Sequence, residues 1–274
     1  SGMVAWELAQ FFTDAFKADL AKLNILPPNV WCKATDHISE QIAFVKELEE
    51  KGFTYRLNDG IYFDSQKLKN YGHLARLNIS GLQEGARVDK GERRFLTDFA
   101  LWKFSPPEEK RQMEWESPWG RGFPGWHIEC SAMSAKFLGD YFDIHCGGED
   151  HIPVHHTNEI AQTEAARGTR LANFWMHGYF LRLKEDKMSK SSGSFVTLQT
   201  ILDRGFNPMV YRYFLLGSHY RTQITFSWEG LEAAKTSLTR LYELAFEWGD
   251  PGEIHQPTLD SIQKDLNNDL ALPK

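Results

Sequence analysis

The stretch "YFDIHCGGEDHIPVHHTNEIAQ" at residues 141–162 determines the fold that we expect. It begins with a short strand-like run, continues through Gly147 and Gly148, and ends in a helical pattern. A strand, a glycine pair and a helix in this order place a site at the carboxyl edge of an α/β sheet. His155 and Glu159 are four residues apart, so both project from one face of the expected helix. That face is either a metal site or a solvated polar stripe.

The composition indicates a globular protein in a reducing compartment. The chain has 274 residues, of which 42% are hydrophobic and 25% charged, enough for one sizeable core with attached subdomains. No run approaches the length of a membrane span, so we expect a soluble, cytoplasmic protein without a membrane partner. Three widely spaced cysteines, Cys32, Cys130 and Cys146, favour ligands or packed thiols over disulfides. The net charge of −6 argues against broad nucleic-acid wrapping but leaves a local phosphate contact open.

Helical and strand-like patterns alternate along the rest of the chain. Asp36 is the expected N-cap of the second helix, and Asp59-Gly60 is expected to form a tight primed turn. The expected elements are helices at 3–23 and 37–51, a hairpin at 53–64, a loop-rich region at 65–97, a strand at 98–104, a loop at 117–126, a helix at 127–138, a strand at 174–183 and helical structure to about 248.

A basic loop, "DKMSKS" at 186–191, follows the last expected strand. Lys187 and Lys190 on such a loop can close over a polyphosphate and stabilise the negative charge that builds at the α-phosphate. The alternative is an exposed, solvated turn, which is the usual environment of surface lysines.

Four ordered motifs identify the sequence as similar to a known family. They are "GWHIECSAMS" at 125–134, "DIHCGGEDHIPVHHTNEIAQTEA" at 143–165, "FWMHGYF" at 174–180 and "DKMSKS". In this order and spacing they resemble cysteinyl-tRNA synthetase, a class I aminoacyl-tRNA synthetase, and the likeness extends from Met3 to Leu272. The resemblance implies an α/β fold: a partial Rossmann-like parallel-sheet domain with an inserted connective subdomain and C-terminal helices.

The resemblance also implies how the chain is divided. It predicts a connective insertion at residues 3–110 and the second half of the Rossmann-like catalytic domain, with the KMSKS loop, at residues 111–205. A helical stem-contact region would occupy residues 206–250, and a linker with the start of a further helical domain would occupy residues 251–274.

A zinc ion in the amino-acid pocket is part of what the resemblance implies. The matching ligands are Cys130, His155 and Glu159, and the family's fourth ligand is a cysteine on an N-terminal strand that this sequence lacks. Such an ion would bind the thiolate of substrate cysteine and discriminate against serine. We rank His156 below His155 because on a regular helix it points away from this face, and Cys146 is a candidate replacement ligand.

Further site residues come from the same motifs. Trp126 and Cys130 would line the cysteine pocket, although a tryptophan is as often a core aromatic. The residues expected to bind ATP are Gly147, Gly148, Asp150, His177 and Lys190, and those expected to be catalytic are Lys187 and Lys190. For His177 the alternative is an interior histidine whose hydrogen bonds are satisfied.

The implied activity is that of a cysteine–tRNA ligase. Its substrates would be ATP with Mg²⁺, L-cysteine and tRNA(Cys), and the full-length protein would be a monomer. No H-x-G-H signature of the family occurs in the sequence, so we expect the isolated chain to be an inactive catalytic-domain fragment. A positive ATP–pyrophosphate exchange assay would refute that expectation.

Two other functions remain open at this point. One is a cysteine ligase of the mycothiol-synthesis type, which resembles the same family and shares its zinc pocket and loop signature. The other is a non-catalytic zinc- or nucleotide-binding module from a split gene. A metalloprotease is a poor third choice, since no His-Glu-x-x-His pattern occurs in the sequence.

Overall fold

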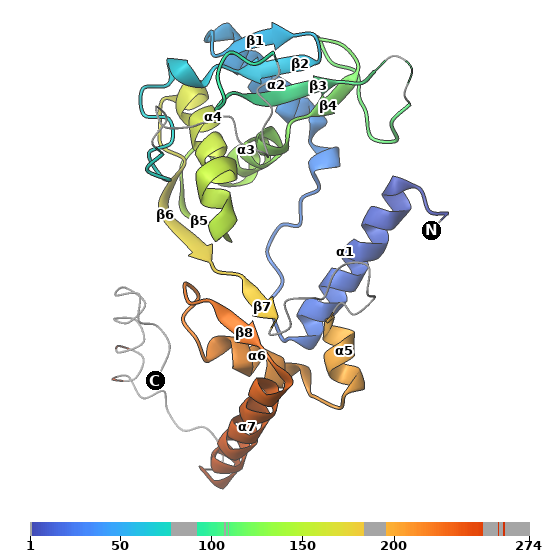
Figure 1. Ribbon diagram of the computed structural model, residues 1–274, viewed down its shortest axis with the longest axis vertical. Coiled ribbons are helices and arrows are strands. Elements are labelled where there is room, and N and C mark those ends of the chain that lie inside the picture. Colours follow the sequence, from blue (N-terminus) through green and yellow to red (C-terminus); the bar gives the residue numbers. More distant parts are fainter. Residues whose placement is uncertain are drawn as a thin grey trace. The chain divides into compact units, whose positions relative to one another are not determined.

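The computed structural model describes residues 2–77, 92–106, 108, 110–183, 196–248, 257 and 260. The helices are α1 (Ala5–Lys22), α2 (Ile38–Glu50), α3 (Trp126–Leu138), α4 (Thr157–Arg167), α5 (Leu198–Asp203), α6 (Pro208–Leu216) and α7 (Trp228–Trp248). The strands are β1 (Thr54–Leu57), β2 (Gly60–Phe63), β3 (Phe99–Phe104), β4 (Gly122–Pro124), β5 (Phe142–Gly148), β6 (Ala172–Gly178), β7 (Leu181–Leu183) and β8 (Ile224–Phe226) (Figure 1).

The chain forms two compact units. Unit 1 comprises Ser1–Glu7 and Asn29–His177, and unit 2 comprises Leu8–Pro28 and Gly178–Lys274. The domain boundaries that the sequence predicts near residues 110, 205 and 250 stay predictions.

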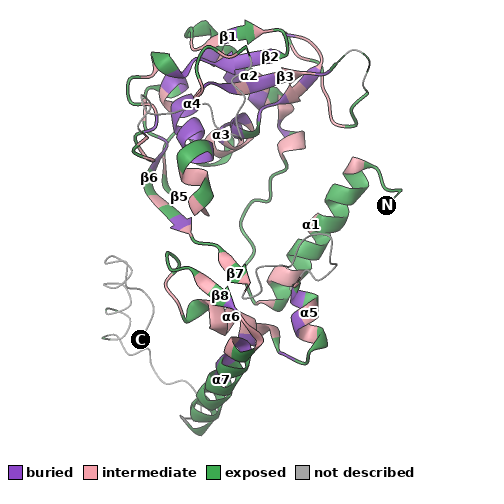
Figure 2. Cartoon of the chain, viewed as in Figure 1, coloured by how far each residue is buried: buried purple, intermediate pink, exposed green. Residues whose placement is uncertain are grey.

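Unit 1 is built around an antiparallel sheet in the order β1-β2-β3-β4. Helices α2, α3 and α4 pack on one another beside this sheet, and α2 and α3 contact its strands (Figure 1). The interface buries Leu48, Phe63, Leu101, Trp102 and Ile128 almost completely, and Figure 2 shows the buried residues gathered in β2, β3 and these helices. Apolar burial of this kind is the main force that holds the sheet and helices together.

The hairpin at β1 and β2 differs from the prediction. Leu57 pairs with Gly60, so Asn58 and Asp59 form the turn and Gly60 is already in β2. A primed turn needs positive φ angles, and none of these three residues has one, so the prediction of a primed turn at Asp59-Gly60 is wrong. Position 60 requires glycine for a different reason, the close approach of a neighbouring strand. A Cβ at Gly60 would lie 2.3 Å from the backbone oxygen of Trp102 on β3.

The predicted cap of α2 is also wrong. Asp36 ends a short 3₁₀ turn, Ala34–Asp36, and His37 takes the N-cap position without a side-chain hydrogen bond. The Gln41 side chain instead donates a 2.7 Å hydrogen bond to the carbonyl of Ala34 and ties the turn to the helix. At the other end, Gly52 has the positive φ of +76° that ends such a helix.

The strand, glycine pair and helix of residues 141–162 form the scaffold of the site. Strand β5 runs through Gly147 and Gly148, and β5 and β6 are hydrogen-bonded neighbours joined by the α4 crossover. Between β5 and α4 lie a 3₁₀ turn, Glu149–His151, and a π-helical turn, Ile152–His156. The π-helical turn was not predicted, and such turns are frequent at functional sites because they change the direction of side chains.

Unit 2 contains the parallel pair β7–β8 and a second core. The prediction of a single strand at 174–183 is wrong, because β6 ends at Gly178 and a separate strand, β7, begins at Leu181. Between them, the Tyr179 amide donates a hydrogen bond to the carbonyl of Tyr220. The continuous helical pattern to 248 is interrupted by β8. On α7, Leu231 and Leu238 are buried, whereas Leu241 is 46% exposed.

Helix α1 forms over the predicted residues, yet it buries none of its side chains. Phe12 and Phe16 of its apolar stripe are 61% and 54% exposed. Helical spacing therefore predicted that this segment is a helix, but spacing does not determine how far its side chains are buried.

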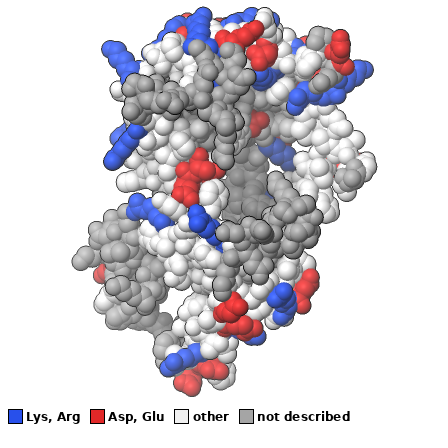
Figure 3. Space-filling view, in the orientation of Figure 1, with Lys and Arg blue, Asp and Glu red and all other residues white. Residues whose placement is uncertain are grey.

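The described surface of unit 1 carries charges of both signs. Figure 3 shows lysine and arginine side chains interspersed with acidic ones around the β1–β4 sheet. Partly exposed pairs of this kind, such as Lys51 with Glu47, contribute little to stability because water screens them. Among the described helices, none combines the length and the apolar character that crossing a membrane would need.

Candidate functional site

A cluster of imidazole rings lies in unit 1 where α3, β5, the π-helical turn and β6 meet. Ring centroids of neighbouring members are about 4.5 to 6 Å apart, and two tryptophans border them. The cluster consists of His127, His145, His151, His155, His156 and His177, with Trp126 and Trp175 beside them.

The three metal ligands expected from the sequence come together in this cluster. One ligand atom each from Cys130, His155 and Glu159 lies within 4.8 Å of the others. His155 Nε2 is 2.7 Å from Glu159 Oε1, one helical turn away, and Cys130 approaches from α3. We refer to these residues as the first trio.

The carboxylate of Glu159 is the strongest sign that the first trio fits a metal ion. Glu159 is 1% exposed, and its two oxygens lie 2.8 Å from Nε2 of His145 and 2.7 Å from Nε2 of His155. A buried carboxylate is costly unless positive charge or hydrogen-bond donors compensate it. A divalent cation would satisfy it, and thiolate, imidazole and carboxylate are the donors that zinc prefers.

The protonation states agree with a cation site. Burial opposes the charge of Glu159, but the imidazoles of His145 and His155 outweigh burial and hold its pKa at about 2. Burial lowers the pKa of His156 to about 3, so its ring is neutral and able to coordinate near pH 7. Burial, and then the charge of Glu159, raise the pKa of the Cys130 thiol to about 12, so Cys130 needs a cation to become a thiolate.

A second group of possible ligands shares Glu159. Ligand atoms of His145, His156 and Glu159 also lie within 4.8 Å of one another, and we refer to these residues as the second trio. The sequence-based expectation that His156 points away from Glu159 is therefore wrong. A regular α-helix was assumed there, whereas His155 and His156 lie in the π-helical turn.

Each helical histidine is held by a further histidine. Nδ1 of His155 lies 3.0 Å from Nδ1 of His127, and Nδ1 of His156 lies 2.8 Å from Nε2 of His177. Contacts of this kind orient an imidazole and leave its other nitrogen for a ligand. His177, which the sequence led us to expect in contact with the nucleotide, thus contacts His156 inside the histidine cluster.

The remaining predicted residues of unit 1 surround this cluster. A Cβ at Gly147 would lie 2.5 Å from Cε1 of His156, and one at Gly148 would lie 2.4 Å from Oδ1 of Asp150. Gly147 is thus needed to admit an imidazole ring. Trp126 is 59% exposed, with its ring centroid 4.3 Å from that of His155.

Two predicted residues cannot be placed. Lys187 and Lys190 lie outside the described residues, and their catalytic and ATP-binding roles stay predictions. Cys146 is exposed and belongs to neither trio.

His127 and His145 were not predicted, although the sequence contains a signal for each. His127 precedes Cys130 by three residues on an expected helix, which places both on one face. His145 lies in β5 immediately before the glycine pair. The signal for His145 is weak, because a strand alternates its faces and does not reveal which face meets a distant helix.

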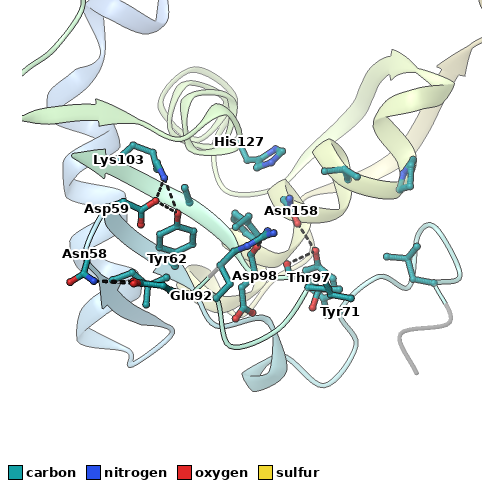
Figure 4. A pocket seen from close by; sticks show the side chains of 18 residues that line it. Asn58, Asp59, Tyr62, Tyr71, Glu92, Thr97, Asp98, Lys103, His127 and Asn158 are labelled. Carbon is teal, nitrogen blue, oxygen red and sulfur yellow. Dashed lines mark hydrogen bonds and ion pairs between the residues drawn. The ribbon is translucent and has the colours of Figure 1, made fainter. Parts of the chain in front are cut away.

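A cavity of about 950 Å³ adjoins the cluster through His127. Figure 4 shows Lys103 contacting Asp59 and Tyr62 on one side, and Tyr71 contacting Asn158 on the other. The volume is in the range of small-molecule sites.

Comparison with known proteins identifies relatives of the chain. It is 58% identical over 275 residues to "Cysteine--tRNA ligase 1" of Burkholderia lata, which covers 100% of this chain and 58% of that protein. It is 48% identical over 251 residues to the "Cysteine--tRNA ligase" of Treponema denticola, covering 91% of this chain and 51% of that protein. The chain thus spans between half and three-fifths of the length of these two curated relatives.

Solved structures show the same fold at low sequence identity. A Mycobacterium tuberculosis methionyl-tRNA synthetase in complex with methionyl-adenylate matches with a TM-score of 0.65 and 16% identity, covering 98% of this chain and 67% of that one. This likeness confirms the predicted α/β fold class. The family model described as "tRNA synthetases class I (C) catalytic domain" matches residues 1–236. The chain therefore belongs to this class I tRNA synthetase family.

Proposed function

We propose that this chain carries the amino-acid site of a cysteine–tRNA ligase. The observation that supports the proposal most directly is the first trio, a half-buried thiol with a buried imidazole and a buried carboxylate whose ligand atoms all lie within 4.8 Å of one another. A zinc ion held by Cys130, His155 and Glu159 would supply a soft Lewis acid that prefers the sulfur of cysteine to the oxygen of serine.

The chain's own residues would position the reactants. Trp126 offers an exposed indole face beside His155, against which an amino-acid substrate would pack. The groups that we propose to contact ATP with its Mg²⁺ are Gly147, Gly148, Asp150, His177 and Lys190. Lys187 and Lys190 would stabilise the charge that develops while the cysteine carboxylate attacks the α-phosphate to give cysteinyl-adenylate and pyrophosphate.

The acceptor that we propose is tRNA(Cys), in the cytoplasm. The names of the relatives support tRNA over an amino sugar, because the Burkholderia lata and Treponema denticola proteins are both cysteine–tRNA ligases. A ribose hydroxyl of the terminal adenosine would then attack the cysteinyl carbonyl, forming an ester and releasing AMP from the adenylate, which completes the reaction.

The test is the selectivity of the zinc-loaded chain for its amino acid. The chain is loaded with zinc, freed of excess metal by gel filtration, and titrated with L-cysteine and L-serine in a calorimeter. We expect L-cysteine to bind at least about 100-fold more tightly, since only the thiol provides a soft ligand. Zinc must elute with the protein after the titration, which excludes simple removal of the metal by free cysteine.

Two variants make the test specific. Cys130→Ser removes the thiolate and should abolish the preference for cysteine, whereas His73→Gln, at an exposed turn away from the cluster, should leave it unchanged. Equal binding of cysteine and serine by the zinc-loaded chain would contradict the proposed function.

A further inference from the structure

We propose that unit 2 carries a contact surface for tRNA, formed by aromatic and arginine side chains beside the β7–β8 pair. The surface consists of Tyr179, Arg182, His219, Tyr220 and Arg221, and we refer to it as the β7–β8 surface. The inference rests on the proposed function for the identity of the RNA. The proposed zinc ligands all belong to unit 1, so the two sites can be tested separately.

Two tyrosines place exposed rings on this surface. Tyr179 is 46% exposed and Tyr220 is 37% exposed, although unit 2 has a core in which aromatic rings are buried. The rings of His219 and Tyr220 lie against each other, with centroids 4.5 Å apart and planes 30° apart. A flat aromatic face left in water is the kind of group on which a nucleobase stacks.

Hydrogen bonds hold these side chains in place. The Tyr179 amide donates to the carbonyl of Tyr220 at 2.9 Å, and the Thr222 amide donates to the carbonyl of His219 at 2.8 Å. The Arg221 amide donates to Nδ1 of His219 at 3.1 Å, so the neutral ring carries its proton on Nε2 and can donate a hydrogen bond from there. A surface that is ordered in advance loses less entropy when a partner binds.

Two arginines add positive charge to the exposed rings. Arg182 is exposed in the middle of β7, whereas Leu181 and Leu183 on either side of it pack against the core of unit 2. The guanidinium of Arg221 lies over the ring of Tyr220, 5.5 Å from its centroid. Arginine in such positions contacts phosphate groups and stacks beside bases.

The charge of the surface favours a polyanion as its partner. The two segments that supply it, residues 178–183 and 216–227, contain no aspartate or glutamate, although the whole chain has a net charge of −6. A basic patch attracts a phosphate backbone, and exposed aromatic faces favour a polyanion that also has bases. RNA meets both conditions, whereas an acidic peptide offers no bases to stack.

Unit 1 contains a matched pair for comparison. Arg170 lies over the ring of Tyr141 at 5.5 Å, the same distance as in the Arg221–Tyr220 pair, and Tyr141 is 42% exposed. Asp143 follows Tyr141 by two residues, so this pair has an acidic neighbour in its own segment. We expect that the pair in unit 1 does not bind RNA.

Titration of a fluorescently labelled tRNA(Cys) transcript with the full chain, followed by anisotropy at several salt concentrations, tests the proposal. Tyr220→Ala should weaken binding about tenfold and leave the slope of log Kd against log salt concentration unchanged, because it removes a stacking face and no charge. Tyr220→Phe keeps the ring and should bind as the unmodified chain does. Arg182→Gln and Arg221→Gln should each lower the slope by about one.

The matched controls are Tyr141→Ala and Arg170→Gln, which should change the affinity for tRNA less than about twofold. Absence of tRNA binding by the unmodified chain would overturn the proposal, and so would variants of the β7–β8 surface that bind as these controls do. Tyr179→Ala replaces Tyr220→Ala, with the same expectation, if circular dichroism shows that Tyr220→Ala does not fold.

The two proposals fail separately. A chain that prefers cysteine to serine but binds tRNA equally well in all variants contradicts only the β7–β8 surface. A chain that binds tRNA through this surface without preferring cysteine contradicts only the proposed function.

Discussion

Among single residues, Gly147 matters to the imidazole cluster as much as the histidines do. Its missing side chain leaves room for two rings, since a Cβ would lie 2.5 Å from Cε1 of His156 and 2.8 Å from Nδ1 of His151. Side chains in a packed interior cannot give way freely. A methyl group at this position should therefore displace His156 from Glu159.

We predict that Gly147→Ala destabilises the chain by about 1–3 kcal/mol, the usual cost of overpacking, and weakens metal binding. Chemical unfolding and cobalt titration measure the two effects. Gly178→Ala is the matched control, because Gly178 is the last residue of β6, as Gly147 is the last but one of β5, and a Cβ at Gly178 would meet nothing within 4 Å. Equal stability of the two variants would show that the cluster tolerates the methyl group.

Glu164 gives a pH-dependent prediction on the same helix as Glu159. Burial raises the pKa of Glu164, and the nearby His73 opposes this only in part. The folded state therefore holds this proton to higher pH than the unfolded state does, and its contribution to stability is lost as pH rises from about 4.5 through the raised pKa.

Glu164→Gln should accordingly stabilise the chain at pH 7 and not at pH 4. The gain should be under about 1 kcal/mol, because the side chain is half-buried and solvent screens part of the effect. Urea unfolding at both pH values measures it, with Glu50→Gln on the exposed end of α2 as the control. A gain of the same size at pH 4 would contradict the assigned cause.

Among the elements, α3 connects the core to the site. One face of α3 packs against α2, α4 and β3, and the same helix carries His127 and Cys130. Ile128 lies between these two residues and is 0% exposed. The position of the metal ligands therefore depends on apolar packing.

We predict that Ile128→Ala costs about 2–5 kcal/mol of unfolding free energy, since it leaves a cavity under the helix. Leu138→Ala, at the 59% exposed end of the same helix, should change stability by less than about 0.5 kcal/mol. Urea unfolding compares the two directly. Similar losses for both variants would mean that α3 is not anchored through its buried face.

At the scale of the whole molecule, both trios lie within unit 1. All their residues fall between Cys130 and Glu159, while unit 2 holds a separate core around Leu231 and Leu238. Ligand binding stabilises the folded state of the part that binds it. Metal should therefore affect the two units unequally.

We predict that zinc at about 100 times its dissociation constant adds about 2.7 kcal/mol to the stability of unit 1. In hydrogen exchange, protection should rise in α3, α4 and β5 and stay unchanged in α6 and α7. The Glu159→Gln variant, which lacks the shared carboxylate, is the control and should show no rise. An equal rise in α6 and α7 would contradict a site confined to unit 1.

Local patterns in the sequence were sufficient to predict most of the helices and strands. The helical spacing predicted α1, α2 and α3, and the strand, glycine pair and helix at 141–162 were found as expected. The errors occurred where distant segments decide the geometry. The β1–β2 turn follows the approach of β3 to Gly60, and the break after Gly178 follows the hydrogen bond from Tyr179 to Tyr220.

The same division applies to the candidate site. The sequence by itself determined the family and the membership of the first trio, because His155 and Glu159 are near neighbours and Cys130 lies in a recognisable motif. Only the tertiary structure brought His145 to Glu159 and turned His156 toward it. Helical periodicity carries no information about which side chains of another strand arrive at a helix, and a π-helical turn breaks the periodicity itself.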